Sequence, residues 1–164
     1  KIQLQPLKKE KIMIKEKIYG EIVQIIREMY DIQTSVIKDV KKILIQKGHT
    51  VDYSGAMSSY SGSYQLSHST GGEHKILIPF LSKERENMLL AEALFEIETE
   101  MQDHAECKNL ARRLMIPIKE FLQQVHLNED HKQMINISKV AAHFHVDESS
   151  VIARGRELGI FDIL

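Results

Sequence analysis

The stretch NMLLAEALFEIETEMQDHAECKNLARRLMIP, residues 87–117, contains two runs of apolar residues at helical spacing. Asp103 and His104 separate the two runs. The first run predicts a helix whose apolar stripe lies opposite Glu92 and Glu96, so we expect these carboxylates to form a solvated acidic face. The two apolar stripes are Leu90, Leu94, Ile97 and Met101 in the first run, and Cys107, Leu110, Ala111 and Leu114 in the second.

A further helical pair is predicted near the end of the chain, in residues 137–160. Its apolar spacing and short central turn have the outline of a helix-turn-helix. The segment contains few basic residues, and its second helix starts with two acidic ones. We therefore expect it to pack on the core rather than to contact phosphates. If the segment did bind DNA, the side chains that face the duplex would be those of Ser149, Ser150, Arg154 and Arg156.

Upstream of the central stretch, residues 8–30 and 36–48 predict two helices. Alternating apolar residues then follow near positions 51–53, 64–66 and 75–78, which predicts a small antiparallel sheet. His68 and His74 flank the last turn of this sheet and could face each other across it. The fold class is therefore α+β. We expect an N-terminal helix in residues 1–34, a core in 35–126, and a helical pair packed on that core in 127–164.

The composition is that of a soluble globular protein of 164 residues, with 43% hydrophobic and 27% charged residues. The net charge of −1 provides no overall field toward nucleic acid or a membrane surface. The single cysteine, Cys107, excludes an intrachain disulfide and fits a reducing compartment. No apolar run is long enough to span a membrane and no signal peptide is visible, so we expect a cytoplasmic location.

Two segments of the central stretch, LAEALFE at residues 90–96 and ECKNLARRLMIP at 106–117, resemble the core of the ImmA/IrrE-type zinc peptidases. That family carries Leu-Ala-His-Glu-Leu-Gly-His on one helix and Glu-Ala-Asn-x-Phe-Ala-Ala-x-Leu-Leu-Met-Pro on the next. Its members commonly follow this core with a helical pair similar to residues 137–160. The resemblance covers about residues 36–160 and implies a zincin-like helical core.

The resemblance places residues that cannot perform the peptidase chemistry at the family's catalytic positions. A zinc peptidase needs two histidines four residues apart, a carboxylate base between them and a third ligand. Here Glu92 and Glu96 stand at the histidine positions, Ala93 stands at the position of the base, and Glu106 matches the third ligand. Alanine cannot accept a proton. We therefore expect a degenerate site with no catalytic residue, no metal and no cofactor. The alternative is an oxygen-only site for calcium, magnesium or manganese at the three glutamates.

Members of this family act on helix-turn-helix repressors and often come from phages and mobile elements. The resemblance therefore implies a non-catalytic regulatory binding protein, or pseudo-peptidase. Such a protein would bind a transcriptional repressor or another regulatory protein and act as an antirepressor or inhibitor. The alternatives are a metallopeptidase with an unconventional metal site and a DNA-binding regulator. Aromatic and arginine side chains usually carry interface energy, so the candidate partner-binding residues are Tyr60, Tyr64, Arg154 and Arg156.

Overall fold

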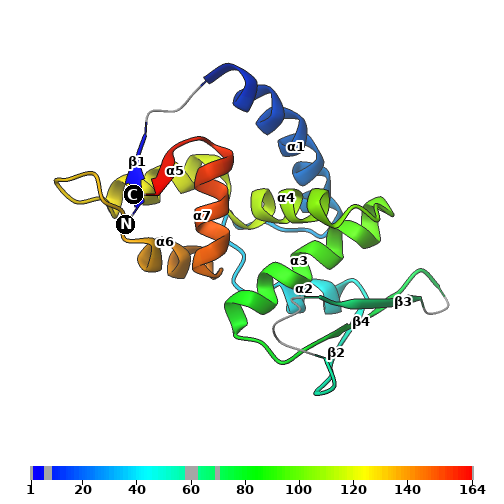
Figure 1. Ribbon diagram of the computed structural model, residues 1–164. Coiled ribbons are helices and arrows are strands. Elements are labelled where there is room, and N and C mark those ends of the chain that lie inside the picture. Colours follow the sequence, from blue (N-terminus) through cyan, green and yellow to red (C-terminus); the bar gives the residue numbers. More distant parts are fainter. Residues whose placement is uncertain (1, 6–8, 58–62, 69–70, 164) are drawn as a thin grey trace.

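The computed structural model describes residues 2–5, 9–57, 63–68 and 71–163, and these form an α+β fold (Figure 1). Within these residues there are seven helices and five strands. In chain order they are β1 (Ile2–Leu4), α1 (Lys9–Met29), α2 (Val40–Gln46), β2 (Thr50–Tyr53), β3 (Gln65–His68), β4 (His74–Ile78), α3 (Lys83–Thr99), α4 (His104–Met115), α5 (Ile118–Leu127), α6 (Ile137–Phe144), α7 (Glu148–Glu157) and β5 (Phe161–Ile163).

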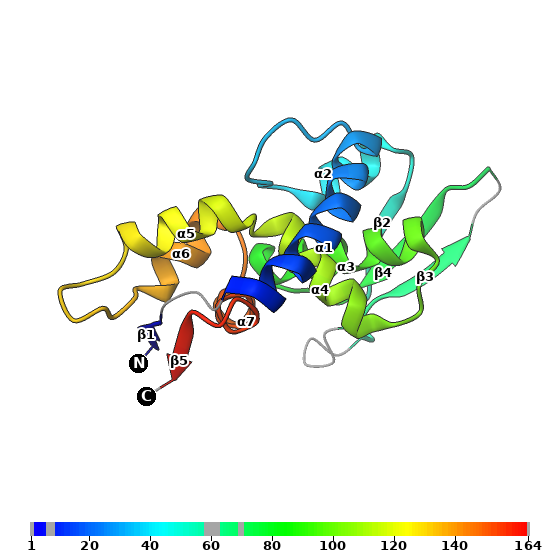
Figure 2. The ribbon, with the colours of Figure 1, turned by 90° about the horizontal axis from the view of Figure 1, so that it is seen from above.

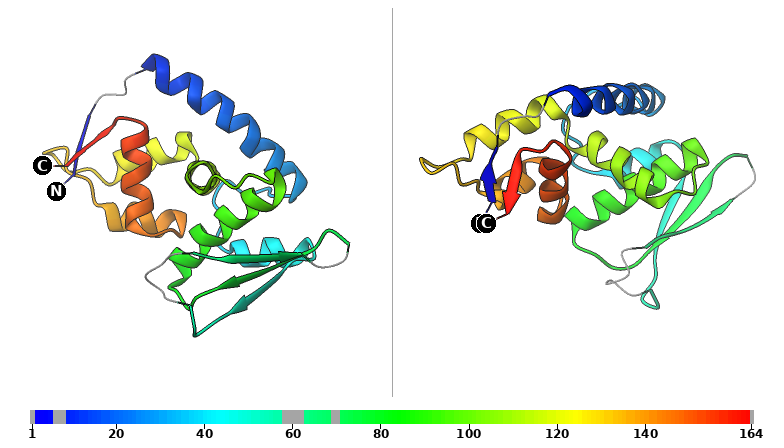
Figure 3. Two further views of the ribbon diagram at one scale, coloured as in Figure 1. Left: turned by 45° about the vertical axis from the view of Figure 1, so that its right-hand side comes forward. Right: turned by 45° about the horizontal axis from the view of Figure 1, so that its top comes forward.

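The helix α3 is the centre of the core, between α4 on one side and β4 and α2 on the other (Figures 1 and 3). It begins at Lys83 and is capped by Ser82, whose hydroxyl accepts a hydrogen bond from the backbone N–H of Arg85 at 3.3 Å. Every residue from Glu86 to Phe95 is buried. The prediction of a solvated acidic face is therefore wrong. Glu92 is only 9% exposed and Glu96 is half-buried, because neighbouring elements cover α3 on more than its apolar stripe.

The larger sheet has the strand order β2-β4-β3 and mixes two directions. The strands β3 and β4 pair antiparallel with His68 opposite His74, as predicted. The expectation of an entirely antiparallel sheet is wrong, because β2 pairs parallel with β4 in the register Thr50↔Lys75. The chain passes from β2 to β3 and then returns as β4 between them. Alternating apolar residues identify a strand but not its neighbour or its direction.

The helix α2 starts later than predicted, at Val40, because the side chain of Asp39 accepts a hydrogen bond from the backbone N–H of Lys42 and caps it. At the other end of the molecule, β1 pairs antiparallel with β5, so the two ends of the described chain lie side by side (Figure 1). The helix α1 packs on α4, on the side away from the larger sheet (Figure 1), and Figure 2 shows α1 from above.

A buried amide fixes the position of the C-terminal helices on the core. Asn87 of α3 is fully buried, and its side-chain oxygen accepts a hydrogen bond from the backbone N–H of Val40 at 3.1 Å. Its side-chain nitrogen donates to the carbonyls of Lys38 at 3.1 Å and His145 at 2.9 Å. His145 belongs to the three-residue link between α6 and α7 and has a φ of 55°. The amide of Asn87 therefore holds the start of α7 against α3.

Candidate functional site

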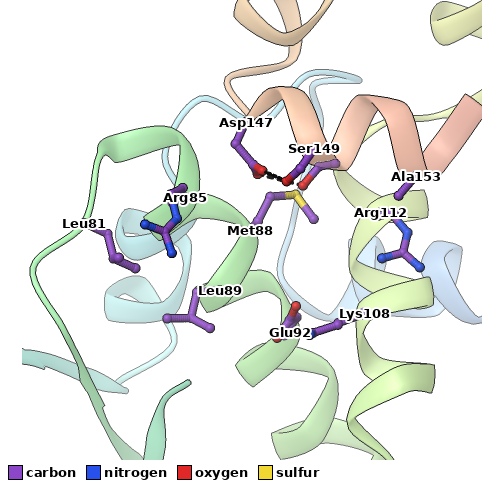
Figure 4. Close-up of a pocket in the computed structure, with 11 residues that line it drawn as sticks. Leu81, Arg85, Met88, Leu89, Glu92, Lys108, Arg112, Asp147, Ser149 and Ala153 are labelled. Atoms are coloured by element: carbon purple, nitrogen blue, oxygen red, sulfur yellow. Dashed lines mark hydrogen bonds between the residues drawn. The ribbon is translucent and has the colours of Figure 1, made fainter. Parts of the chain in front are cut away.

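A cleft of about 250 Å³ lies where α3, α4 and the start of α7 meet (Figure 4). One face of α3 lines it with side chains at spacings of three, four and seven residues, and α4 contributes two side chains four residues apart. The cleft is smaller than a typical pocket for a drug-sized ligand and suits a single side chain or a chain end. Its lining residues are Leu81, Arg85, Met88, Leu89, Glu92, Lys108, Arg112, Asp147, Ser149, Ser150 and Ala153.

Glu92 is the unusual group of the cleft. Its side chain is nine-tenths buried, and it makes no hydrogen bond or ion pair with another described residue. Burial raises the pKa of this carboxyl to about 7, Lys108 and Arg112 oppose the rise, and Asp147 adds to it. Near neutral pH, Glu92 is therefore divided between its acid and its carboxylate. A buried group with such a shifted pKa in a cleft is typical of functional sites.

The α4 wall of the cleft carries two positive charges. Arg112 is held by Glu157, with nitrogen–oxygen distances of 2.7 Å from Nε and 2.5 Å from its terminal nitrogen. Lys108 makes no hydrogen bond or ion pair within the part of the chain that the structure describes. Figure 4 shows its ammonium and the Glu92 carboxyl directed toward each other. Lys108 is therefore available to a ligand, whereas Arg112 is fixed in place beside it.

The third wall is the beginning of α7. Asp147 occupies the capping position, but its side chain does not cap the backbone. Its carboxylate instead accepts hydrogen bonds from the hydroxyls of Ser149 and Ser150, the latter at 2.7 Å. The first-turn N–H groups of α7 thus lack a side-chain cap, and they carry the positive end of the helix dipole. This end favours a negative group in the cleft.

The positions matched to the peptidase site do not come together as a metal site. Ala93 is fully buried. Glu106 accepts a hydrogen bond from the hydroxyl of Tyr19 on α1, whereas Glu92 lines the cleft. Among the described residues, no group of three His, Cys, Asp or Glu side chains could hold a metal ion. The alternative of an oxygen-only site at Glu92, Glu96 and Glu106 is therefore wrong.

The four candidate partner-binding residues differ in how exposed they are in the structure. Arg156 is exposed, as an interface anchor must be. Tyr64 is half-buried, its ring packs edge-on against His104, and burial together with the nearby carboxylate of Glu96 raises the pKa of its hydroxyl. Tyr60 lies outside the described residues. For Arg154 the prediction of a surface anchor is wrong, because this side chain is only 1% exposed.

Arg154 is buried because it has a carboxylate partner on α1. Its two terminal nitrogens donate to the two oxygens of Glu16, each at 2.7 Å, and its Nε donates to the carbonyl of Ile116 at 3.1 Å. Arg113 of α4 adds a contact to Glu16 at 2.9 Å. Burial disfavours the charge of Glu16, yet the hydrogen bonds and charges of Arg154 and Arg113 hold its pKa below the ordinary value. The Glu16–Arg154 pair therefore joins α1 to α7.

Sequence reasoning missed Lys108, Arg112 and the wall formed by α7. The i, i+4 spacing of Lys108 and Arg112 places them on one side of α4, and this pattern was visible in the sequence. Nothing in the sequence indicated that α7 would face them. No protein-family model, curated protein or solved structure matches the chain. In the described part of the chain, no helix has the length and apolar character that crossing a membrane requires.

Proposed function

We propose that the protein is a non-catalytic regulatory binding protein, and that the cleft between α3, α4 and α7 receives part of a partner protein. The observation that carries this proposal is Glu92, a residue only 9% exposed, whose carboxyl lines the cleft and makes no hydrogen bond or ion pair with the described residues. A carboxyl that is largely removed from water and has no partner in the fold can gain hydrogen bonds from a bound molecule. The apolar side chains of Leu81, Met88 and Leu89 beside it suit a protein ligand.

Two buried side chains near the cleft, Ala93 and Cys107, are unsuited to catalysis. Ala93, at the position that the resemblance gives to the catalytic base, is buried and cannot accept a proton. Cys107, the single cysteine, is buried, and burial together with the charges of Glu96 and Glu92 raises the pKa of its thiol to about 11. A thiol of this kind is a poor nucleophile at neutral pH.

The class of the partner rests on the resemblance of residues 90–96 and 106–117 to the ImmA/IrrE-type peptidases. We propose a helix-turn-helix repressor or a related regulatory protein, bound by a pseudo-peptidase that keeps a zincin-like core and a helix-turn-helix-like terminal pair. Such a protein would act by occupancy, as an antirepressor or inhibitor in a phage or mobile element. Direct DNA binding has little support, because Arg154 is buried and Ser149 and Ser150 line the cleft.

The test is co-purification with two matched baits. The substitution Ala153→Phe fills the cleft from α7, whereas Lys119→Phe adds the same side chain at an exposed position of α5. We expect a helix-turn-helix regulatory protein of full length to be retained by the wild type and by Lys119→Phe, and lost with Ala153→Phe. Retention by Ala153→Phe would show that the cleft is not the binding site. Shortening of the retained protein during incubation would show a peptidase.

A further inference from the structure

We infer that the cleft binds a carboxylate, supplied by an acidic side chain or by a chain end, and that this carboxylate shares a proton with Glu92. The inference rests on the proposed function because it names the chemistry of the partner group at the same site. It concerns Glu92, Lys108 and the uncapped start of α7, which converge from three separate elements. No other part of the described chain supplies Glu92 with a hydrogen-bonding partner.

The charges around the cleft favour an anion. Of the basic side chains in the lining, Arg112 is paired with Glu157, and Lys108 makes no hydrogen bond or ion pair within the described residues; Asp147 is the one acidic lining residue besides Glu92. The carboxylate of Asp147 is occupied by the hydroxyls of Ser149 and Ser150. The first-turn N–H groups of α7 add a positive partial charge. Lys108 and the start of α7 therefore favour an anionic ligand over a cationic one.

The carboxyl of Glu92 selects among anions. As a neutral acid, Glu92 donates one hydrogen bond, and a carboxylate is a strong acceptor for an O–H donor. The ligand carboxylate then lies between the O–H of Glu92 and the ammonium of Lys108. The proton stays within the pair of carboxyl groups, and no bond is formed or broken. The volume of about 250 Å³ leaves room for a short apolar stem against Met88 and Leu89.

Binding is consequently linked to protonation of Glu92. The charged groups that face it are Lys108 and Arg112 on α4, Asp147 before α7 and Arg85 on α3 itself. Glu92, with a pKa of about 7, changes its charge between pH 6 and pH 8. Carboxylate affinity should fall by about tenfold from pH 6 to pH 8, as the acid form of Glu92 is depleted.

The experiment is a titration of the full chain, followed through its backbone amide resonances in two-dimensional NMR spectra. Three probes are compared at pH 6 and pH 8: N-acetylleucine, which carries a chain-end carboxylate; N-acetylleucinamide, which has the same shape without the charge; and the α-amide of N-acetylglutamate, which carries a side-chain carboxylate. We expect one or both carboxylates to shift the resonances of Lys108, Ser149 and Ser150, about tenfold more tightly at pH 6. The stronger of the two identifies the source of the carboxylate.

Two variants distinguish the contribution of the Glu92 proton from that of the Lys108 charge. Glu92→Gln keeps a hydrogen-bond donor that does not titrate, so it should bind the carboxylate with the same affinity at pH 6 and pH 8. Lys108→Met should weaken binding at both pH values and still bind the carboxylate more tightly at pH 6 than at pH 8, because Glu92 remains titratable. These opposite results would not arise if the substitutions merely disturbed the fold.

Several results would overturn the inference. They are equal binding of N-acetylleucinamide, no shift at the cleft with any probe, or a pH dependence that survives in Glu92→Gln. Tighter binding of inorganic phosphate at pH 8 than at pH 6 would show an ordinary anion site and would also overturn it. Each of these leaves the co-purification result with Ala153→Phe unchanged, so the carboxylate inference can fail while the proposed function stands.

Discussion

Glu16 and Glu92 are buried to the same extent, each 9% exposed, but their surroundings have opposite effects on their ionisation. Both oxygens of Glu16 accept hydrogen bonds from Arg154, each at 2.7 Å. Glu92 has Lys108 and Arg112 nearby but no hydrogen bond to either. The pKa of Glu16 is lowered despite its burial, whereas burial raises the pKa of Glu92 to about 7. At Glu92 the two nearby cations oppose the effect of burial on the pKa but do not cancel it, whereas at Glu16 the bonded arginines do.

The difference follows from how the arginines are distributed. Arg154 points from α7 to α1 and forms a complete pair with Glu16, whereas Arg112 is held by Glu157 at the edge of the cleft. In the Glu16–Arg154 pair, each charged group is bonded to its partner inside the fold. The arrangement at the cleft leaves a carboxyl and the ammonium of Lys108 facing an open volume. We therefore assign a structural role to the Glu16–Arg154 pair and a binding role to the cleft.

The largest expected effect is that of removing Arg154. Arg154→Met leaves the carboxylate of Glu16 buried, with Arg113 as its remaining cation, and should lower the free energy of unfolding by about 3–5 kcal/mol. The measurement is urea denaturation at pH 7. Arg156→Met is the matched control, since it makes the same change two residues away at an exposed position of α7 and should cost less than about 0.5 kcal/mol. Equal losses from the two substitutions would contradict the structural role of the pair.

The substitution Glu16→Gln tests the other partner and has a distinct pH dependence. Glutamine keeps an acceptor for Arg154 but removes the charge, so we expect a loss of about 2–4 kcal/mol at pH 7. Because the pKa of Glu16 is lower in the folded state than its ordinary value of 4.5, its stabilisation is present above that value and is lost as the pH falls through the folded-state pKa. The difference between wild type and variant should therefore shrink on acidification. A difference that grows with acid would reverse our assignment.

The substitution Glu92→Gln should raise the free energy of unfolding, whereas Glu16→Gln should lower it. The pKa of Glu92 rises from 4.5 to about 7 on folding, so the folded state retains a proton that the unfolded state has released. The contribution of the neutral form is complete below about pH 4.5 and is lost as the pH rises through 7. Because glutamine does not ionise, the variant should be more stable than wild type by about 1–3 kcal/mol at pH 8 and equal to it at pH 4.5. Lower stability of Glu92→Gln at pH 8 would mean that the carboxylate has a partner in solution.

The sequence predicted those parts of the molecule that depend on local patterns. The helices α3 and α4 follow from apolar spacing, and the β3–β4 hairpin was predicted with His68 opposite His74. The parallel pairing of β2 with β4 was not predicted, because direction depends on where the chain returns. The sequence predicted that Glu92 is exposed, because the single apolar stripe of α3 suggested that only one side of this helix is buried. Small residues such as Ala91 and Ala93 allow neighbouring elements to pack on the rest of α3.

The charged residues of the site were harder to predict than the helices. Arg154 looked like a surface residue because arginine is mostly exposed unless it is paired. Its partner, Glu16, is 138 residues away in the chain, and no local pattern connects the two positions. Arg112 and Lys108 were identifiable as one face of α4, but their role depends on α7, which Asn87 holds in place through the carbonyl of His145. Tertiary packing thus decides which charges are structural and which remain open to a ligand.

The smallest expected effect is on the ionisation of Glu92 itself, and it shows how much an unbonded cation contributes. Lys108 is the largest of the influences that oppose the raised pKa of Glu92. Lys108→Met should therefore raise this pKa further, by about 0.5 unit, since the interaction is a Coulombic one across a partly solvated cleft. Lys119→Met on the exposed side of α5 is the control and should leave the titration unchanged. The measurement is the side-chain carboxyl 13C shift of Glu92 between pH 5 and pH 9. A shift of two units or more would mean that Lys108 forms a direct ion pair with Glu92 in solution. Glu92 and Lys108 would then form an ion pair like that of Glu16 and Arg154, and both pairs would have a structural role.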